Sequence, residues 1–226
     1  GSYEHLKALW LSLLLAGVST VICLILAYPL ALILRKRHIG KGSFVVFIFI
    51  LPMWMNFLLR TMAWQTLLEK NGVINTFLTL LHLPNVAIIN TPAAIILGMV
   101  YNFIPFMILQ IHTSLDKMDK SLLEAASDLG ATPAQAFLRV TLPLSLPGVI
   151  SGITLVFLPA VSSFFIPKLL GGGQYVLVGN IIESQFLTSG DWNFGSAISL
   201  IMAVIIMISM WLTRKADVQV ASQGKE

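Results

Sequence analysis

The feature that most constrains this sequence is the length of its uncharged runs. Residues 8–34, 92–115, 147–167 and 192–212 contain no Asp, Glu, Lys or Arg. A helix of about 20 mostly apolar residues crosses the hydrocarbon core of a bilayer, where backbone polar groups must bond within the segment. Only 11% of the 226 residues are charged, well below the roughly 25% typical of soluble domains. The sequence therefore predicts an all-α polytopic membrane protein.

A fifth run, residues 43–68, carries a single charge, Arg60, and is long enough to form a fifth transmembrane helix. Four of the five predicted spans contain an internal proline, at Pro29, Pro52, Pro105 and Pro159. Each proline removes a backbone hydrogen bond, which membranes tolerate where neighbouring groups or a water-lined cavity satisfy the freed carbonyl. Static kinks are one explanation, and helices bent around a path are the other.

Basic residues are unevenly shared between the two sides that five spans define. Ten of the 14 Lys and Arg residues fall in residues 35–42, 116–146 and 213–226. Because cytoplasmic loops are enriched in Lys and Arg, these segments are predicted to be cytoplasmic and the N-terminus to be outside. The chain opens on Gly1-Ser2 without a methionine, so we expect that a preceding span has been removed.

A polar segment, residues 121–148, interrupts the apolar chain with signals for two short helices. Ser121 and Glu124 have the spacing of a capping box at a helix start. Gly130 suits the left-handed residue that ends such a helix, and Thr132 followed by proline suits the start of a second one. The segment is therefore expected to form an L of two capped helices at the cytoplasmic surface.

This L has two possible uses. It is either an amphipathic connector lying on the membrane, or a docking surface for a cytoplasmic partner. Leu122, Ala126 and Leu129 share one face of the first helix, and Pro143 and Pro147 are predicted to end the second. So small an apolar face binds a membrane weakly by itself, which favours docking.

The same residues resemble a known motif. The matching positions are Glu124-Ala125-Ala126, Gly130-Ala131, Phe137, Leu142-Pro143-Leu144 and Pro147-Gly148. Together they are similar to the EAA loop of permease subunits of binding-protein-dependent ABC importers. The resemblance implies a type I importer fold, with residues 1–226 as a single transmembrane domain and residues 116–147 as the coupling loop. The family usually has six helices, so the five predicted here correspond to a six-helix core without its first helix.

The resemblance also implies a set of partners and a location. In the family, the two short helices dock on a cytoplasmic ATPase subunit, which here assigns coupling to Glu124, Ala125, Ala126, Gly130, Phe137 and Pro143. The expected partners are a second homologous permease, two ATPase subunits, an extracytoplasmic solute-binding protein and the lipid bilayer, with no nucleic acid. The chain itself is expected to bind no cofactor, since ATP and Mg²⁺ belong to the ATPase. It would lie in the bacterial inner membrane, with the EAA loop and the C-terminus in the cytoplasm.

Further stretches resemble one branch of this family, the spermidine/putrescine permeases. They are residues 51–75, 101–131, 169–187 and 191–197. This likeness implies ATP-driven import of polyamines, with import of another small solute as the alternative inside the class. A channel-like membrane protein outside the ABC class is the other alternative; it explains the kinked helices but not the EAA loop.

A polycation path calls for carboxylates and aromatic faces. The candidates are Trp54, Arg60, Tyr101, Phe164, Glu183, Asp191 and Trp192. The aromatic residues also suit an interfacial belt, and the two carboxylates suit solvated loops. The cation Arg60 either extends to the membrane interface or pairs with Glu183 or Asp191 in the closed state of the transporter.

Enzymatic alternatives lack their residues. No Asp or Glu lies within a predicted span, the four histidines fall near span ends or in loops, and no phosphate-binding G-x-x-x-x-G-K-[ST] sequence is present. The lone Cys23 leaves neither a disulfide framework nor a cysteine-based metal site. The sequence thus predicts a transport subunit whose ATP hydrolysis takes place on a separate chain.

Overall fold

The structure, a computed structural model, describes residues 2–36, 48 and 51–223, and no strand occurs among them. The helices are α1 (Ser2–Lys36), α3 (Phe57–Leu68), α4 (Val73–Leu80), α5 (Pro92–Asp116), α6 (Lys120–Asp128), α7 (Pro133–Ala136), α8 (Leu142–Val161), α9 (Phe165–Leu170), α10 (Val178–Leu187) and α11 (Trp192–Gln223). A π-helical segment, Phe137–Thr141, joins α7 to α8. The all-α prediction is confirmed.

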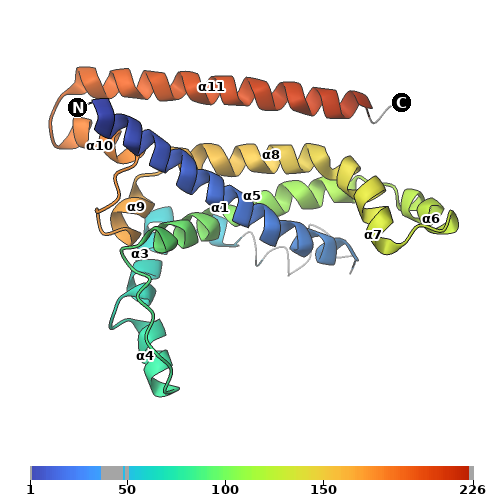
Figure 1. The fold of residues 1–226 in the computed structure, drawn as a ribbon, viewed down its shortest axis with the longest axis horizontal. Coiled ribbons are helices and arrows are strands. Elements are labelled where there is room, and N and C mark those ends of the chain that lie inside the picture. Colours follow the sequence, from blue (N-terminus) through green and yellow to red (C-terminus); the bar gives the residue numbers. More distant parts are fainter. Residues whose placement is uncertain (1, 37–47, 49–50, 224–226) are drawn as a thin grey trace.

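Helices α1, α5 and α8 form the packed centre of the molecule, with α1 running diagonally across the other two (Figure 1). The most buried side chains come largely from these helices, for example Ala27, Met107, Ile111 and Val156. Helix α5 is the most buried of the long helices and α11 the least. Helix α11 packs on α8 and α10 at the outside of the bundle.

Glycines in α8 let it approach α5 closely. A Cβ on Gly148 would lie 2.7 Å from the carbonyl oxygen of Gln110, and one on Gly152 would lie 2.5 Å from Met107 Sδ. Small residues at such a spacing allow transmembrane helices to gain backbone contact in the absence of a hydrophobic driving force. The α5–α8 pair is therefore fixed by the two glycines.

Four helices of the described chain are long and apolar enough to cross a membrane: Tyr3–Lys36, Pro92–Asp116, Pro133–Val161 and Trp192–Ala216. The predicted fifth span, residues 43–68, is not one continuous helix. Residues 51–54 are helical, but α3 starts anew after Asn56, whose Oδ1 accepts from the amides of Leu58 (2.9 Å) and Leu59 (3.3 Å). Asparagine favours a helix start, which explains this break. Residues 43–47 and 49–50 of that span lie outside the described residues.

The fourth predicted span, residues 147–167, was also placed wrongly. Helix begins at Pro133 and continues through the π segment into α8, so neither Pro143 nor Pro147 ends it. A proline ring normally crowds the carbonyl four residues earlier, which for Pro143 is that of Arg139. Arg139 lies in the π segment, where the wider i→i+5 bonding relieves this clash. At its other end α8 stops at Val161, and α9 follows separately.

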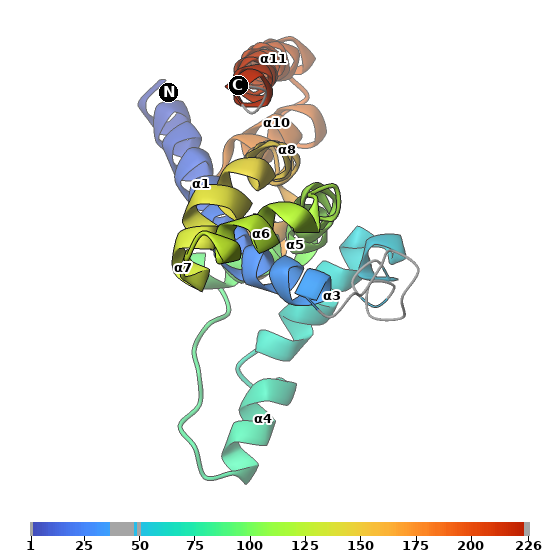
Figure 2. The ribbon, with the colours of Figure 1, turned by 90° about the vertical axis from the view of Figure 1, so that its right-hand side faces the viewer.

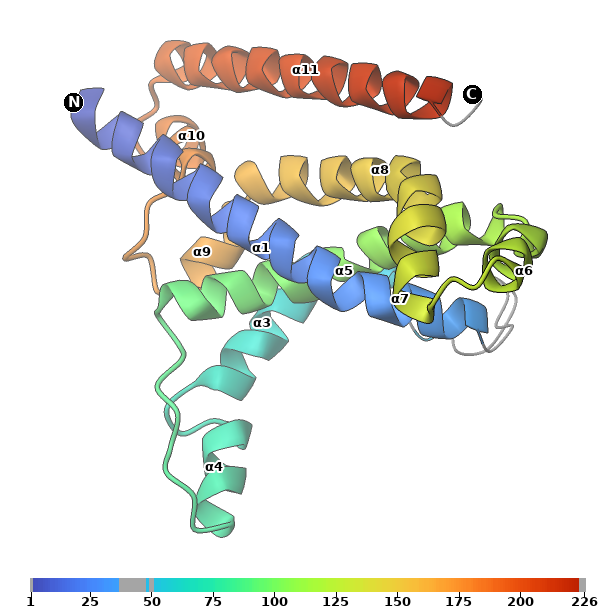
Figure 3. The same ribbon diagram turned by 45° about the vertical axis from the view of Figure 1, so that its right-hand side comes forward.

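The bundle has two distinct ends. Helices α6 and α7, the end of α1 and the end of α11 lie together at one end, while α9, α10 and the start of α11 lie at the other (Figures 1 and 3). Helices α3 and α4 project sideways from the bundle as an arm (Figure 2). The segments that carry Arg35, Lys120, Arg139 and Arg214 thus share one end, in agreement with the common sidedness predicted from charge.

The glycine contacts generate a graded stability prediction. Gly148→Ala should lower the melting temperature of the detergent-solubilised protein, because its Cβ would meet α5 backbone; overpacking of this kind costs about 1–3 kcal/mol. Gly152→Ala should be milder, since its nearest neighbour is the flexible end of Met107. Gly17→Ala is the control, because no atom lies within 4 Å of its Cβ position. Equal melting temperatures for all three variants would contradict the packing argument.

Candidate functional site

The two short helices form an elbow, defined here as α6, residues 129–132 and α7. The first helix is capped by Asp119, whose Oδ1 accepts from the Ser121 amide at 3.0 Å. The predicted capping box of Ser121 and Glu124 is therefore wrong, because an aspartate two residues earlier takes the cap position. The amide of Ser121 also lowers the pKa of the Asp119 carboxyl, since the bond favours the charged form.

The bend and the second helix follow the prediction. Gly130 has a φ of 84°, in the left-handed region, and its position has nothing within 4 Å of a Cβ. Thr132 caps α7 and forms a capping box with Gln135, in which Thr132 Oγ1 accepts from the Gln135 amide at 3.2 Å and Gln135 Oε1 accepts from the Thr132 amide at 3.0 Å. The angle of the elbow is thus fixed by local backbone chemistry.

The elbow and the π segment that follows it present apolar side chains outward. Leu129 is 89% exposed, Leu138 60% and Leu122 44%. Glu124 and Ala125 are also exposed and Ala126 is half-buried. Exposed leucines on a capped segment are typical of a surface that contacts either a partner protein or the membrane.

Two of the predicted coupling residues lie beyond the elbow, toward the membrane-spanning part of α8. Phe137 opens the π segment and is half-buried, with its ring edge-to-face on Tyr28 of α1. Pro143 is exposed near the start of α8. The six predicted coupling residues therefore occupy one end of the molecule: four are exposed, Ala126 is half-buried, and Phe137 is turned to the bundle.

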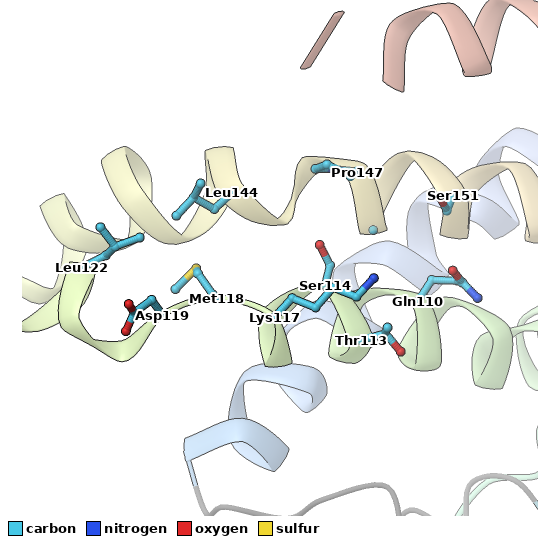
Figure 4. Close-up of a pocket in the computed structure, with 11 residues that line it drawn as sticks. Gln110, Thr113, Ser114, Lys117, Met118, Asp119, Leu122, Leu144, Pro147 and Ser151 are labelled. Carbon is cyan, nitrogen blue, oxygen red and sulfur yellow. The ribbon is translucent and has the colours of Figure 1, made fainter. Parts of the chain in front are cut away.

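Next to the elbow lies a cleft of about 600 Å³ that the sequence analysis missed (Figure 4). It is bounded by the last turns of α5, the start of α6 and the first turns of α8. Its polar side chains are Gln110, Thr113, Ser114, Lys117, Asp119 and Ser151. These hydroxyl, amide and charged groups offer hydrogen bonds to a hydrated solute. Their only sequence signal is a polar side chain recurring about every third or fourth residue along one helix.

At the opposite end, the predicted carboxylates have structural partners. Glu183 on α10 forms an ion pair with Lys168, with 3.0 Å between Glu183 Oε1 and Lys168 Nζ. Asp191 caps α11, because its Oδ1 accepts a hydrogen bond from the Phe194 amide at 3.1 Å. Neither is paired with Arg60 in this structure, and the pairing predicted for the closed state stays a prediction. Trp192 is 66% exposed and packs edge-to-face on Phe186 of α10.

Arg60 and Tyr101 are the predicted path residues that the structure brings together. Trp64, one turn after Arg60, connects them, because its ring meets the Tyr101 ring with the centroids 5.2 Å apart. Arg60 lies over the ring of Phe57 at 5.9 Å and is only 8% exposed, so it does not extend to solvent. Among the described residues, its Nε and Nη1 have no hydrogen-bond acceptor.

The remaining predicted path residues stand apart from this pair. Trp54 is 73% exposed, just before the break at Asn56. Phe164 precedes α9, and its carbonyl accepts from Asn180 Nδ2 at 3.1 Å. The described residues hold no cluster of three or more His, Cys, Asp or Glu side chains. The chemistry of these regions is hydrogen bonding, aromatic contact and charge.

Comparison with known proteins gives this arrangement a family. The model described as "Binding-protein-dependent transport system inner membrane component" matches residues 10–220. The chain belongs to this family. It is accordingly a multi-pass inner-membrane protein and a transport subunit rather than an enzyme.

Similar proteins carry permease names. The chain is 41% identical over 216 residues to the spermidine/putrescine transport system permease protein PotB of Haemophilus influenzae, covering 94% of this chain and 75% of that one. It is 40% identical over 215 residues to PotB of Escherichia coli (strain K12), covering 94% and 78%. A PotB homolog of Mycoplasma genitalium is 30% identical over 217 residues, covering 92% and 73%.

Solved structures agree on the fold. A bacterial ABC transporter involved in the import of the acidic polysaccharide alginate superposes with a TM-score of 0.77 at 18% identity, covering 95% of this chain and 79% of that one. The MetNI methionine ABC transporter, in an inward-facing conformation, gives 0.71 at 16% identity and covers 97% of each chain. The predicted ABC importer permease fold is confirmed.

Proposed function

We propose that this chain is the permease subunit of an ATP-driven importer for polyamines, the class that includes spermidine and putrescine. The identity to proteins named as spermidine/putrescine permeases supports the substrate class. The elbow carries the argument for mechanism: it is capped, exposes leucines, and its second helix continues through the π segment into α8. A displacement of α7 therefore moves the end of a membrane-spanning helix directly.

The proposed cycle follows from this continuity. Closure of two cytoplasmic ATPase subunits, which bind ATP and Mg²⁺, pulls on Leu129 and the surface around Glu124 in the elbow, and on Leu138 just after it. Helix α8 follows α7, and α5 follows α8, because Gly148 and Gly152 hold the two helices in backbone contact. The path between this permease and a second, homologous one then changes its open side. An extracytoplasmic solute-binding protein delivers the substrate to the end that carries α9 and α10.

The substrate route is proposed to use groups at both ends. At the outer end, Glu183, Asp191 and the neighbouring Trp192 attract and stack on ammonium groups; the ion pair of Glu183 with Lys168 would exchange for one with substrate. Arg60 on α3 and Tyr101 on α5 lie where these two helices meet, and the fixed positive charge of Arg60 would there repel a cation that has no carboxylate partner. At the cytoplasmic end, the cleft beside the elbow offers Gln110, Ser114 and Ser151 for release.

The substrate prediction is tested by reconstitution. Vesicles that hold the permease pair, the ATPase and the binding protein should accumulate labelled spermidine or putrescine only when ATP is supplied to the ATPase side. Uptake of an unrelated solute such as an amino acid, with no uptake of either polyamine, would assign the chain to another substrate class. Uptake without ATP would point to a channel.

Orientation is tested separately. With the elbow in the cytoplasm, a single cysteine placed at Lys36 should be protected from an impermeant thiol reagent in intact cells, and one at Asn71 should react. Cys23 is buried and is replaced by alanine in both variants. Labelling of the Lys36 position with protection of the Asn71 position would reverse the orientation and remove the docking argument.

The elbow is tested at its bend. Gly130→Val should reduce uptake while the subunits still assemble, because a β-branched residue at φ 84° costs roughly 1–2 kcal/mol or more and shifts α7. Since no atom crowds this position, the effect comes from the backbone alone. Gly130→Asn is the matched control, because asparagine tolerates the left-handed region. If the Gly130→Val variant takes up as much polyamine per ATP hydrolysed as the wild type, the elbow is only a connector.

A further inference from the structure

Helix α1 contacts the chain on both sides of the elbow from one face. Tyr28 meets the junction of α7 and α8, and Arg35 meets the junction of α5 and α6. The two residues are seven positions apart, which is two turns of helix, so they project from the same side of α1.

Tyr28 contacts residues at both ends of the π segment. Its ring packs edge-to-face on Phe137, the first residue of that segment, with centroids 5.6 Å apart and an interplanar angle of 89°. Its hydroxyl lies 2.5 Å from Ser145 Oγ, in the first turn of α8 after the segment. Ser145 Oγ donates its own proton to the Leu142 carbonyl at 3.0 Å, so Tyr28 is the donor to Ser145. Both side chains are buried, Tyr28 at 8% and Ser145 at 0% exposure.

Arg35 holds the other junction. Its Nη2 donates to the Met118 carbonyl at 3.4 Å, and its Nη1 lies 3.9 Å from Met118 Sδ. Met118 stands between the end of α5 and the Asp119 cap of α6. The segment that enters the elbow from α5 and the segment that leaves it toward α8 are therefore both fastened to α1.

The far end of α1 reaches the outer side of the bundle. Ser12 Oγ accepts from the amide of Val178, the first residue of α10, at 2.8 Å in a buried contact. Helix α10 carries Glu183. Because α1 is helical without interruption from Ser2 to Lys36, it joins the elbow to the outer helix that holds this carboxylate.

We propose that α1 transmits the motion of the elbow to the outer end of the permease, and that Tyr28 is the positioning residue that makes this possible by clamping the π segment. The proposal rests on the coupling function proposed above. A π segment is a locally weakened stretch of helix and commonly marks a functional position. With Phe137 and Ser145 both held by Tyr28, the segment cannot rewind independently, so α7, α8 and α1 move together. Without the clamp, the segment becomes a soft joint that absorbs the displacement of α7.

Coupling stoichiometry is the first readout. In reconstituted vesicles, Tyr28→Phe should leave assembly and ATP hydrolysis near wild type while polyamine imported per ATP falls about threefold to tenfold, the range expected for a lost buried hydrogen bond. Ser145→Ala should act similarly, and the double variant should be no worse than the more affected single variant, because both remove one shared bond. Tyr3→Phe is the matched control, since Tyr3 is 78% exposed at the other end of α1.

Amide hydrogen exchange is the second readout, and it needs no transport. In the purified complex, exchange at residues 138–142 should be about fivefold faster in Tyr28→Phe than in wild type, and unchanged in Tyr3→Phe. If wild-type vesicles fail to import polyamine, the proposed function is wrong and this measurement alone decides the clamp. Unchanged exchange overturns the clamp. If exchange is faster in Tyr28→Phe but the polyamine imported per ATP hydrolysed stays at the wild-type value, the clamp has no role in coupling. The same conclusion follows if the rates of import and of ATP hydrolysis fall by the same factor.

Discussion

The close approach of α5 and α8 is the contact on which the rest of the molecule depends. In lipid, one apolar helix gains little by exchanging acyl chains for another apolar helix, so stable pairing needs backbone proximity or polar contacts across the interface. Gly148 and Gly152 supply the proximity, since a methyl group at either position would collide with Gln110 or Met107. Everything at the elbow end is placed by this pair: the cleft lies between the two helices, and the elbow is the chain that connects them.

Polar side chains in the bundle divide into structural and unsatisfied groups. Ser12, Tyr28 and Ser145 have partners across helices, and such bonds define how the helices register against one another. Asn102 Oδ1, both His112 nitrogens and two Arg60 nitrogens are buried without a partner within the described residues. An unpaired buried polar atom costs free energy, and the cost is greater for a charge. Such atoms identify where groups from outside the chain would be most stabilising.

The elbow differs from a simple connector in its continuity. Helix runs without a break from Pro133 through the π segment to Val161, so the exposed surface and the membrane span are parts of the same body. A fully regular helix would be stiffer, but proline at position 143 would then crowd the carbonyl of Arg139. The π segment resolves that conflict and leaves a weakened stretch, which the contacts of Tyr28 support from α1.

The sequence by itself determined the class, the all-α membrane architecture, the grouping of basic residues at one end, and the caps at Gly130 and Thr132. These depend on composition or on a few neighbouring residues, and local chemistry is readable from local sequence. The EAA-loop residues likewise identified the family before any contact was known. The sequence-based prediction was wrong where neighbouring residues compete for the same local role. Asp119, rather than Ser121, takes the cap position of α6, and Asn56 starts a new helix inside an apolar run.

Only the tertiary structure decided which faces of the helices meet. The bond between Tyr28 and Ser145 joins residues 117 positions apart, and that between Ser12 and Val178 joins residues 166 apart. No periodicity links such pairs, because their contact depends on helix direction, crossing angle and the depth to which glycines allow packing. The same reason separates Glu183 and Asp191 from Arg60, and places six polar groups of α5, α6 and α8 around one cleft.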